Sequence, residues 1–312
     1  MSQEVEVRLP YSALGTPFRP DIPLLWNNQR FIDWAEAAGC NNVEFHGLRG
    51  AVRDILHKTP REIAAMTQIR SGHVLFNPFS SSLPETLWAV LSGKQDPIRP
   101  KEKFNPLVLA FAEGPRTSLA LHKLENAKAS EDFFIVVYPY KSTRRNPFGT
   151  YRKTLIQTHP EAFNDASDAQ DFIADINAGR STGMVWDTYQ ALGATDSGLR
   201  PLQPWEESLP KLLEAGVVKE VHIQAGRTVY IDCTIPSMTW LRNMAGTPNH
   251  NTELGKMIRM VKASNPKIPF VVEVTLDGLV AARLINKTDL LDPNLGKAKK
   301  VYRALADFIK LV

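Results

Sequence analysis

Three ionisable residues lie within or just after apolar runs of the sequence. Apolar runs are buried in the fold, so ionisable side chains from different runs can meet there in one site. Glu273 lies between two valines, Asp187 follows the apolar run 184–186, and His222 lies between a valine and an isoleucine. Charged groups are rarely buried without a partner, and carboxylates beside an imidazole suit general acid–base chemistry. We expect all three to be catalytic. The alternatives are a structural ion pair for the two carboxylates and, for His222, a core histidine bonded to the backbone.

Other polar side chains end further apolar runs of the sequence. The uncharged ones suit a neutral polar ligand, and the alternative for them is a water-filled pocket. For His46 the alternative to ligand binding is an exposed loop position. The substrate-binding residues expected from these runs are Glu44, His46, Asn77, Tyr138, Gln157 and Gln190.

The densest group of basic residues near the end of an expected strand is Lys141, Arg144 and Arg145. Guanidinium groups form strong, often bidentate hydrogen bonds to phosphate and carboxylate groups. We expect this loop to bind an anionic group of the substrate. The alternative is a solvated surface loop without a ligand.

The segments that must position these residues alternate between short runs of β-branched or aromatic residues and runs of helical pattern. Eight strands, each followed by a helical pattern, favour a (β/α)8 TIM barrel, an α/β fold with a closed parallel sheet, over an open sheet. In such barrels the active site lies at the C-terminal ends of the strands. The expected strands are residues 5–9, 43–46, 73–77, 133–138, 153–157, 184–187, 220–223 and 270–274.

Helical patterns fill the intervals between these strands. The clearest helix start is at Thr59, where Pro60 and Glu62 complete a capping box with proline at the first helical position. Residues 95–130 are the least regular stretch and are expected to be an insertion in a single domain spanning 1–312. The expected helices are residues 28–39, 59–70, 84–91, 117–126, 167–176, 205–213, 254–261 and 297–311.

The composition is that of an ordinary soluble globular protein, with 43% hydrophobic and 22% charged residues in a chain of 312. Neither Cys40 nor Cys233 belongs to a CxxC pair, which favours a reduced, cytoplasmic setting. The first residues lack the pattern of a secretion signal, and no apolar run approaches the about 18 residues of a membrane span. A net charge of only +4, without a long basic stripe, counts against a nucleic-acid partner.

Several segments resemble the xylose-isomerase-like barrels, the superfamily of sugar-phosphate isomerases, epimerases and AP endonucleases. They read GMVWDTYQ at 183–190, VHIQ at 221–224 and VVEV at 271–274, and VEF at 43–45 is similar to the family's acidic second strand. The resemblance runs over nearly the whole chain. It implies a barrel that acts on a small sugar or hydroxy-carbonyl compound, with metal ligands at the strand ends.

At several of those ligand positions the chain departs from the family pattern. Asn77 and Tyr138 occupy positions at which the family commonly has histidines, on the third and fourth strands. Gln157 replaces the glutamate that ends the fifth strand, and Gln190 replaces the histidine that follows the sixth strand. An amide is neutral, cannot act as a general base, and binds a cation more weakly than a carboxylate or an imidazole. The resemblance then leaves only Asp187, His222 and Glu273 as ligands. We therefore expect no bound divalent metal and no other cofactor.

Two classes of function follow from these observations. The first is an isomerase or epimerase for a small sugar or hydroxy-carbonyl compound, in which the three ionisable residues do the acid–base work without metal. The second is a barrel that binds a small ligand or a partner protein and has lost catalysis, which the departures at ligand positions favour. The fold cannot choose between them, because barrels of this kind carry many unrelated functions.

Overall fold

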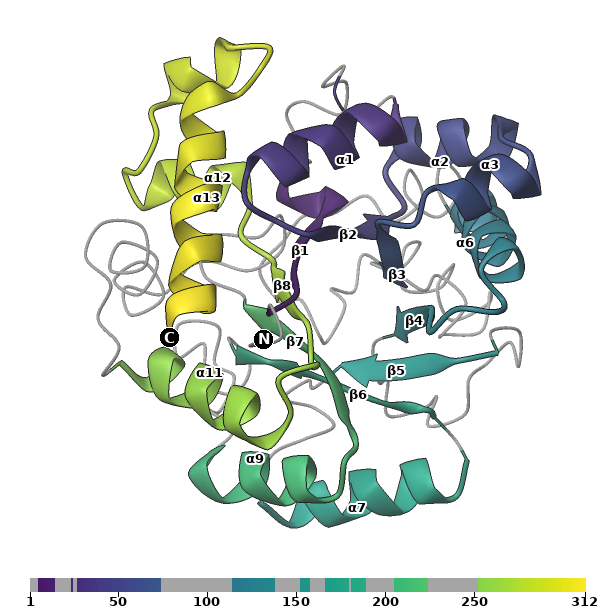
Figure 1. The fold of residues 1–312 in the computed structure, drawn as a ribbon, viewed down its shortest axis with the longest axis vertical. Helices are drawn as coiled ribbons and strands as arrows, with labels where there is room; N and C mark the ends of the chain where they lie inside the picture. The colour runs from purple at the N-terminus through teal and green to yellow at the C-terminus, as the bar shows by residue number, and fades with distance from the viewer. Residues whose placement is uncertain are drawn as a thin grey trace, which may run out of the picture.

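A closed barrel of eight parallel strands, in the order β1 to β8, forms the centre of the molecule (Figure 1). The structure, a computed structural model, describes residues 5–14, 24, 27–73, 114–137, 152–157, 166–179, 181–188, 205–223 and 252–312. Each strand pairs with the next along the chain, and β8 pairs with β1 to close the ring. The expected (β/α)8 barrel is therefore confirmed.

The strands lie close to the segments expected from sequence, with one displacement. They are β1 Val7–Pro10, β2 Asn42–His46, β3 Ile69–His73, β4 Phe134–Val137, β5 Thr154–Gln157, β6 Gly183–Asp187, β7 Val218–Ile223 and β8 Phe270–Val272.

The displaced strand is β3, which ends at His73, whereas the sequence placed the start of the third strand there. Its inward side chains, Ser71 and His73, are polar, so it lacks the apolar run that marks the other strands. Its outward side is Gly72, where an added Cβ would lie 2.7 Å from Cδ2 of Leu121. Glycine at this position therefore allows the helix that carries Leu121 to pack closely on β3. Neither the polar inward residues nor the glycine is typical of a strand in the sequence.

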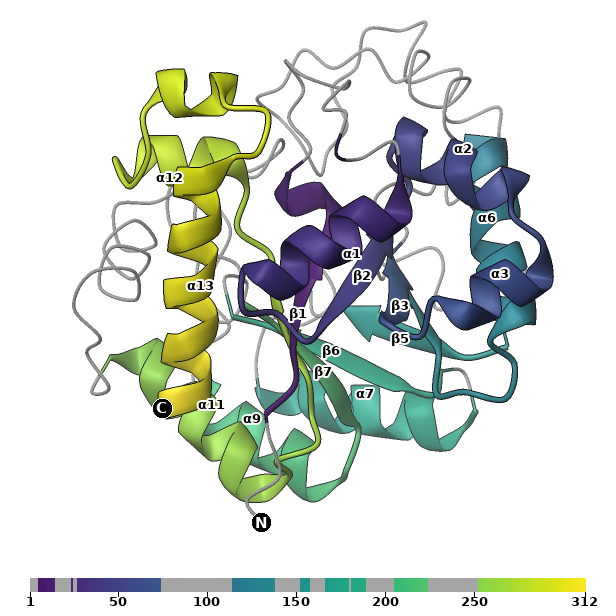
Figure 2. The ribbon, with the colours of Figure 1, turned by 45° about the horizontal axis from the view of Figure 1, so that its top comes forward.

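Helices surround the barrel on its outside (Figure 2). The long ones lie near their expected positions, and the capping box at Thr59 is confirmed. The helix it begins ends at Ala65 rather than near residue 70, because Ile69 already belongs to β3. Helices α2 and α12 were not expected. The helices are α1 Asn28–Ala37, α2 Arg49–His57, α3 Pro60–Ala65, α6 Gly114–Ala127, α7 Ala166–Asn177, α9 Trp205–Glu214, α11 Glu253–Ser264, α12 Leu276–Ala281 and α13 Gly296–Leu311.

The last helix, α13, completes the outer layer of the barrel. It contacts α1 and packs beside β1 and β8, where the sheet closes. The Tyr302 hydroxyl on α13 lies 2.6 Å from the carbonyl oxygen of Val274 and 3.1 Å from that of Ala13. The start and end of the barrel are thus tied to the same helix.

Parts of the expected organisation lie outside the described residues. They include the helix expected at 84–91 and the first part of the insertion expected at 95–130, whose later part contains α6. The assignment of 1–312 to one domain stays a prediction. None of the described helices is long and apolar enough to cross a membrane.

The interior of the barrel is apolar beside β4 to β6, except for Gln157 and Asp187 at the ends of β5 and β6, and polar beside the other strands named below. On β4, β5 and β6 the residues Val136, Leu155 and Val185 form a small buried apolar cluster of their own. On β1, β2, β3 and β7 the buried residues include Arg8, Glu44, Ser71 and Glu220. Barrel interiors of this fold are usually filled by branched apolar side chains. The polar side therefore marks where the strands bring charged groups together.

Candidate functional site

Four side chains from two pairs of adjacent strands, β2 with β3 and β7 with β8, form a closed ring of alternating carboxylates and imidazoles. They are Glu44 on β2, His73 on β3, His222 on β7, and Glu273 immediately after β8. Side chains two residues apart on a strand point to the same face, so β2, β3 and β7 each direct an i, i+2 polar pair into the barrel. Four strands thereby deliver donor atoms to one buried region.

The gaps between neighbouring members of this ring are similar in length. Nδ1 of His73 lies 3.7 Å from Oε1 of Glu44 and 3.9 Å from Oε1 of Glu273. On the other side, Nδ1 of His222 lies 3.3 Å from Oε2 of Glu273, and its Nε2 lies 3.6 Å from Oε2 of Glu44. The ring is therefore compact: two of its contacts join adjacent strands, and the other two cross the interior of the barrel.

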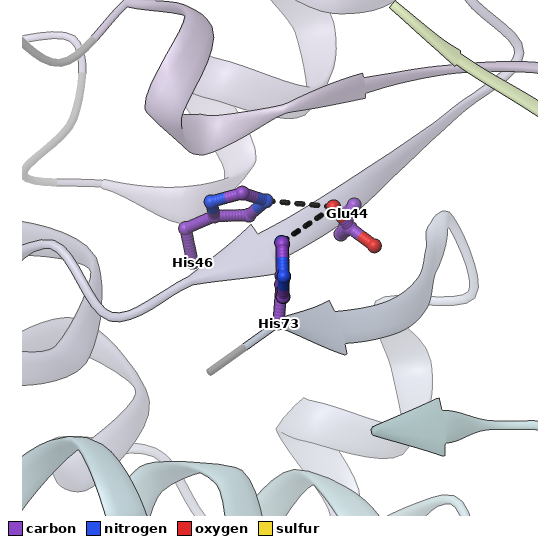
Figure 3. Close-up of side chains that lie close together, drawn as sticks. All are labelled: Glu44, His46 and His73. Carbon is purple, nitrogen blue, oxygen red and sulfur yellow. Dashed lines mark hydrogen bonds and ion pairs between the residues drawn. The ribbon is translucent and has the colours of Figure 1, made fainter. Parts of the chain in front are cut away.

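A further histidine contacts this ring from β2. Figure 3 shows His46 and His73 both directed toward Glu44, and Nε2 of His46 lies 2.7 Å from Oε1 of that carboxylate. The imidazoles of His46 and His73 pack edge to face, with their centroids 4.9 Å apart. His46 is fully buried. The exposed-loop alternative for His46 is therefore wrong.

Two more buried side chains lie beneath the ring. Glu220 accepts a hydrogen bond from Arg8 on β1, and its Oε1 lies 2.9 Å from Nε2 of His222. The hydroxyl of Ser71 accepts from Arg8 at 3.1 Å and donates to Oε2 of Glu44 at 3.1 Å. The ring thus rests on a hydrogen-bonded polar floor inside the barrel.

Electrostatics divide the two ring imidazoles into different protonation states. Burial lowers the pKa of His73 to about 4, and the nearby carboxylates of Glu44 and Glu273 only partly oppose this. Burial also acts to lower the pKa of His222, but Glu44, Glu220 and Glu273 together raise that pKa well above its usual value. At neutral pH the imidazole of His73 is therefore uncharged. The imidazole of His222 is protonated and positively charged, and the neighbouring carboxylates stabilise that charge.

The carboxylates of the ring stay ionised despite their burial. Burial alone would raise the pKa of Glu44, yet His222 and His46 hold it well below its usual value. The pKa of Glu273 is lowered for the same reason, with His222 as the main opposing partner. For Glu220, burial and the nearby Glu44 raise the pKa in spite of Arg8. The region thus brings buried carboxylates together with the neutral imidazole of His73, a combination that attracts a cation.

The donor atoms of this region fit the requirements of a divalent metal ion. Zinc binds imidazole nitrogen and carboxylate oxygen at about 2.0–2.2 Å in a tetrahedral arrangement, so neighbouring donors lie about 3.3–3.6 Å apart. The gaps of the ring run from 3.3 to 3.9 Å. Three overlapping groups, each with donor atoms within 4.8 Å of one another, are Glu44–His46–His73, His73–His222–Glu273 and Glu44–Glu220–His222.

Asp187 and Gln157 form a second polar group at the same end of the barrel. The Gln157 amide on β5 donates a hydrogen bond of 2.7 Å to Oδ2 of Asp187 on β6, and both side chains are buried. Among the described residues, Oε1 of Gln157 has no hydrogen-bond partner. The amide therefore holds the carboxylate in place and leaves an acceptor oxygen buried in the interior.

The structure brings together part of the expected site. His222 and Glu273 belong to the ring together with Glu44, His46 contacts it, and Asp187 pairs with Gln157. His222 contacts carboxylates rather than only the backbone. The functional roles expected for these residues stay predictions. Outside the described residues lie Asn77, Tyr138, Lys141, Arg144, Arg145 and Gln190.

Sequence reasoning missed four residues of this region: Arg8, Ser71, His73 and Glu220. His73 was taken as the start of a strand and not as its end, because the apolar run follows it. A usable signal was present in the strands themselves, where the polar pairs Glu44/His46, Ser71/His73 and Glu220/His222 all show i, i+2 spacing.

The chain matches no known protein family and no curated protein sequence. Among solved structures, the crystal structure of AsfvAP:AG is 10% identical, with the match covering 93% of this chain and 99% of that chain at a TM-score of 0.49. A crystal structure of IOLI protein with a bound zinc atom is 11% identical, with 97% and 99% covered and a TM-score of 0.48. The likeness of this chain to both concerns the barrel fold alone.

Proposed function

We propose that the barrel mouth is a divalent-cation site at which a small sugar or hydroxy-carbonyl compound undergoes a proton-transfer reaction of the isomerase or epimerase class. The observation that carries the proposal is the buried ring of Glu44, His73, Glu273 and His222, whose neighbouring donor atoms lie 3.3 to 3.9 Å apart. Buried carboxylates without compensation are costly. Arg8 and the proton of His222 offset two of the three carboxylates Glu44, Glu220 and Glu273, and a bound cation would take the place of that proton.

The proposal departs from the metal-free site expected from sequence, because that expectation rested on an incomplete set of ligands. It counted Asp187, His222 and Glu273, whereas the ring adds Glu44 and His73 and leaves Asp187 outside. Neutral imidazole is the form of histidine that binds metal, and His73 is neutral above about pH 4. We propose that His73, His222 and Glu273, with Glu44, hold the ion.

The chain's own residues then divide the remaining work. A divalent cation held by the ring would polarise a carbonyl oxygen of the substrate. Asp187, which Gln157 orients through their 2.7 Å hydrogen bond, is the carboxylate left to take a proton from the adjacent carbon. Oε1 of Gln157 would accept a hydrogen bond from a substrate hydroxyl. Asn77, Tyr138 and Gln190, with the basic loop 141–145 for a phosphate or carboxylate group, stay predicted substrate contacts.

The experiment that tests this proposal is solvent-proton exchange at the carbon beside a carbonyl. Metal-loaded and chelator-treated protein would be incubated in deuterated water with a panel of ketoses, aldoses and their phosphates, and deuterium incorporation followed by NMR. We expect incorporation in one or more compounds only with metal-loaded protein, and loss of it in Asp187→Asn. The matched control is Asp33→Asn, because Asp33 accepts a similar bond of 2.8 Å from Gln29 on the surface of α1.

A second candidate function is a barrel that binds a ligand without turning it over. The observation that favours it is Gln157, since its neutral amide pairs with Asp187 and leaves a single carboxylate, instead of two, beside the substrate. Metal-loaded protein that binds compounds of the panel in calorimetry, yet incorporates no deuterium into any of them, would favour this function over catalysis.

A further inference from the structure

Arg8 is the one guanidinium group that the described structure places inside the barrel. It projects from β1 and is only 6% exposed. Its Nε donates to Oε1 of Glu6 at 2.7 Å, and its Nη1 reaches both Ser71 and Glu220. A single side chain at the floor of the barrel therefore contacts groups from β3 and β7, which are not neighbouring strands.

Each of the two inner contacts of Arg8 continues to a member of the ring. Through the Ser71 hydroxyl, the chain of hydrogen bonds reaches Oε2 of Glu44, with 3.1 Å for each step. Through Glu220 it reaches Nε2 of His222 at 2.9 Å. Arg8 is thus two hydrogen bonds away from a carboxylate on one side of the ring and from an imidazole on the other.

The energetic cost of this arrangement argues against a role in stability alone. A buried ion pair such as Arg8–Glu220 often contributes no more to stability than apolar residues of the same volume would. The same interior offers that alternative on β4 to β6, where Val136, Leu155 and Val185 fill the space. Histidines that bind metal usually donate their second ring nitrogen to a carboxylate, which fixes the orientation of the imidazole.

We propose that Arg8 is a positioning residue that pre-organises the cation site, orienting His222 through Glu220 and Glu44 through Ser71. The inference rests on the cation site proposed above, and it adds that the geometry of the site is set from the floor of the barrel. Glu220 acts as the carboxylate that orients His222 and not as a ligand of the ion. Ser71 acts as the corresponding link to Glu44.

The first test is zinc affinity, measured by competition with a chromophoric chelator on metal-free protein. Outer partners of metal ligands typically contribute about 10–100-fold to metal affinity, and we expect Arg8→Met and Glu220→Gln each to weaken zinc binding by that factor. Because removal of one partner leaves a buried charge, the double variant Arg8→Met/Glu220→Gln is included. Folding of each variant is checked by circular dichroism and thermal unfolding.

Two comparisons separate positioning from general damage. Arg70→Met is the control, because Arg70 on β3 pairs with Glu131, which lies outside the site. We expect its zinc affinity to stay within about twofold of the wild type, whereas the loss of an outer partner of a metal ligand weakens affinity by about 10-fold or more. Arg8→Lys keeps a cation near Glu220 and Ser71 but removes the Nε donor that holds the side chain against Glu6, so we expect an intermediate affinity. Zinc affinity in the double variant equal to that of the wild type would overturn the inference.

A second readout does not depend on metal. In metal-free protein, the long-range proton–nitrogen NMR correlations of the His222 ring report the hydrogen bond at Nε2. We expect these signals to shift in Arg8→Met and Glu220→Gln and to stay in place in Arg70→Met. Wild-type protein that binds no zinc would contradict the cation site, while unmoved His222 signals in both variants would contradict the role of Arg8, so the two failures are distinguishable.

Discussion

His73 and His222 face each other across the interior of the barrel, with ring centroids 5.4 Å apart and ring planes at 73°. They belong to β3 and β7, which lie on opposite sides of the barrel. Each imidazole lies beside both Glu44 and Glu273. The carboxylates of Glu44 and Glu273 thus lie between an uncharged imidazole, that of His73, and a protonated one, that of His222.

His73 is expected to be a direct ligand, and its removal should therefore weaken metal binding more than the removal of any outer partner. We expect His73→Asn to raise the zinc Kd by at least about 100-fold, the upper end of the effect of outer partners. The measurement is competition with a chelator. The control is His57→Asn, because His57 is exposed on α2. Equal zinc affinities in the two variants would exclude His73 from the site.

Metal affinity should depend on pH through one imidazole and not through two. The raised pKa of His222 means that binding displaces its proton, so affinity falls as the pH is lowered. His73, with a pKa of about 4, is already neutral and adds no second proton. We expect zinc affinity to fall by about tenfold for each pH unit below neutrality, over the range in which His222 is protonated and His73 is not. Calorimetry in buffers of different ionisation enthalpy counts the released protons, and two protons or none would contradict this assignment.

Gln157→Glu should make the metal-free protein less stable. The new carboxylate would lie beside Asp187, in place of an amide that now donates at 2.7 Å in a buried setting. We expect a loss of about 3 kcal/mol of unfolding free energy, comparable to leaving a buried charge without its partner. Chemical denaturation measures the change.

The matched control for this substitution lies on the surface. Gln29 donates to Asp33 at 2.8 Å on the exposed face of α1, so Gln29→Glu makes the same chemical change in water. Exposed charge pairs contribute about 0–1 kcal/mol, and we expect a change in that range. Equal losses in the two variants would mean that Gln157 and Asp187 do not form the buried pair described above.

The fold was predictable because most strands carry an apolar run with a clear end. The runs at β4, β6 and β8 gave strand positions within a residue or two of those observed. Their ends also indicated Asp187 and Glu273 as inward polar residues. A parallel barrel places such ends at one mouth, so the location of the candidate site followed from the fold.

The proposed metal ligands were harder to predict because the polar residues inside the barrel interrupt the apolar pattern of the strands. In β3 the inward residues are Ser71 and His73, and Gly72 faces a closely packed helix, so periodicity favoured the residues that follow. The count of ligands then relied on Asn77, four residues beyond the end of β3. A contact across the barrel, such as the 3.9 Å gap from His73 to Glu273, joins residues 200 positions apart and leaves no local pattern.

The central claim is tested most directly by calorimetric titration of chelator-treated protein with zinc, with the bound metal confirmed by elemental analysis. His73, His222 and Glu273 form one group whose donor atoms lie within 4.8 Å of one another, and Oε1 of Glu44 lies 3.7 Å from Nδ1 of His73. We predict about one zinc ion per chain, with binding lost in His73→Asn and kept in His57→Asn. Folded wild-type protein that takes up no zinc, manganese or magnesium under the same conditions would contradict the account and would support the metal-free site expected from sequence.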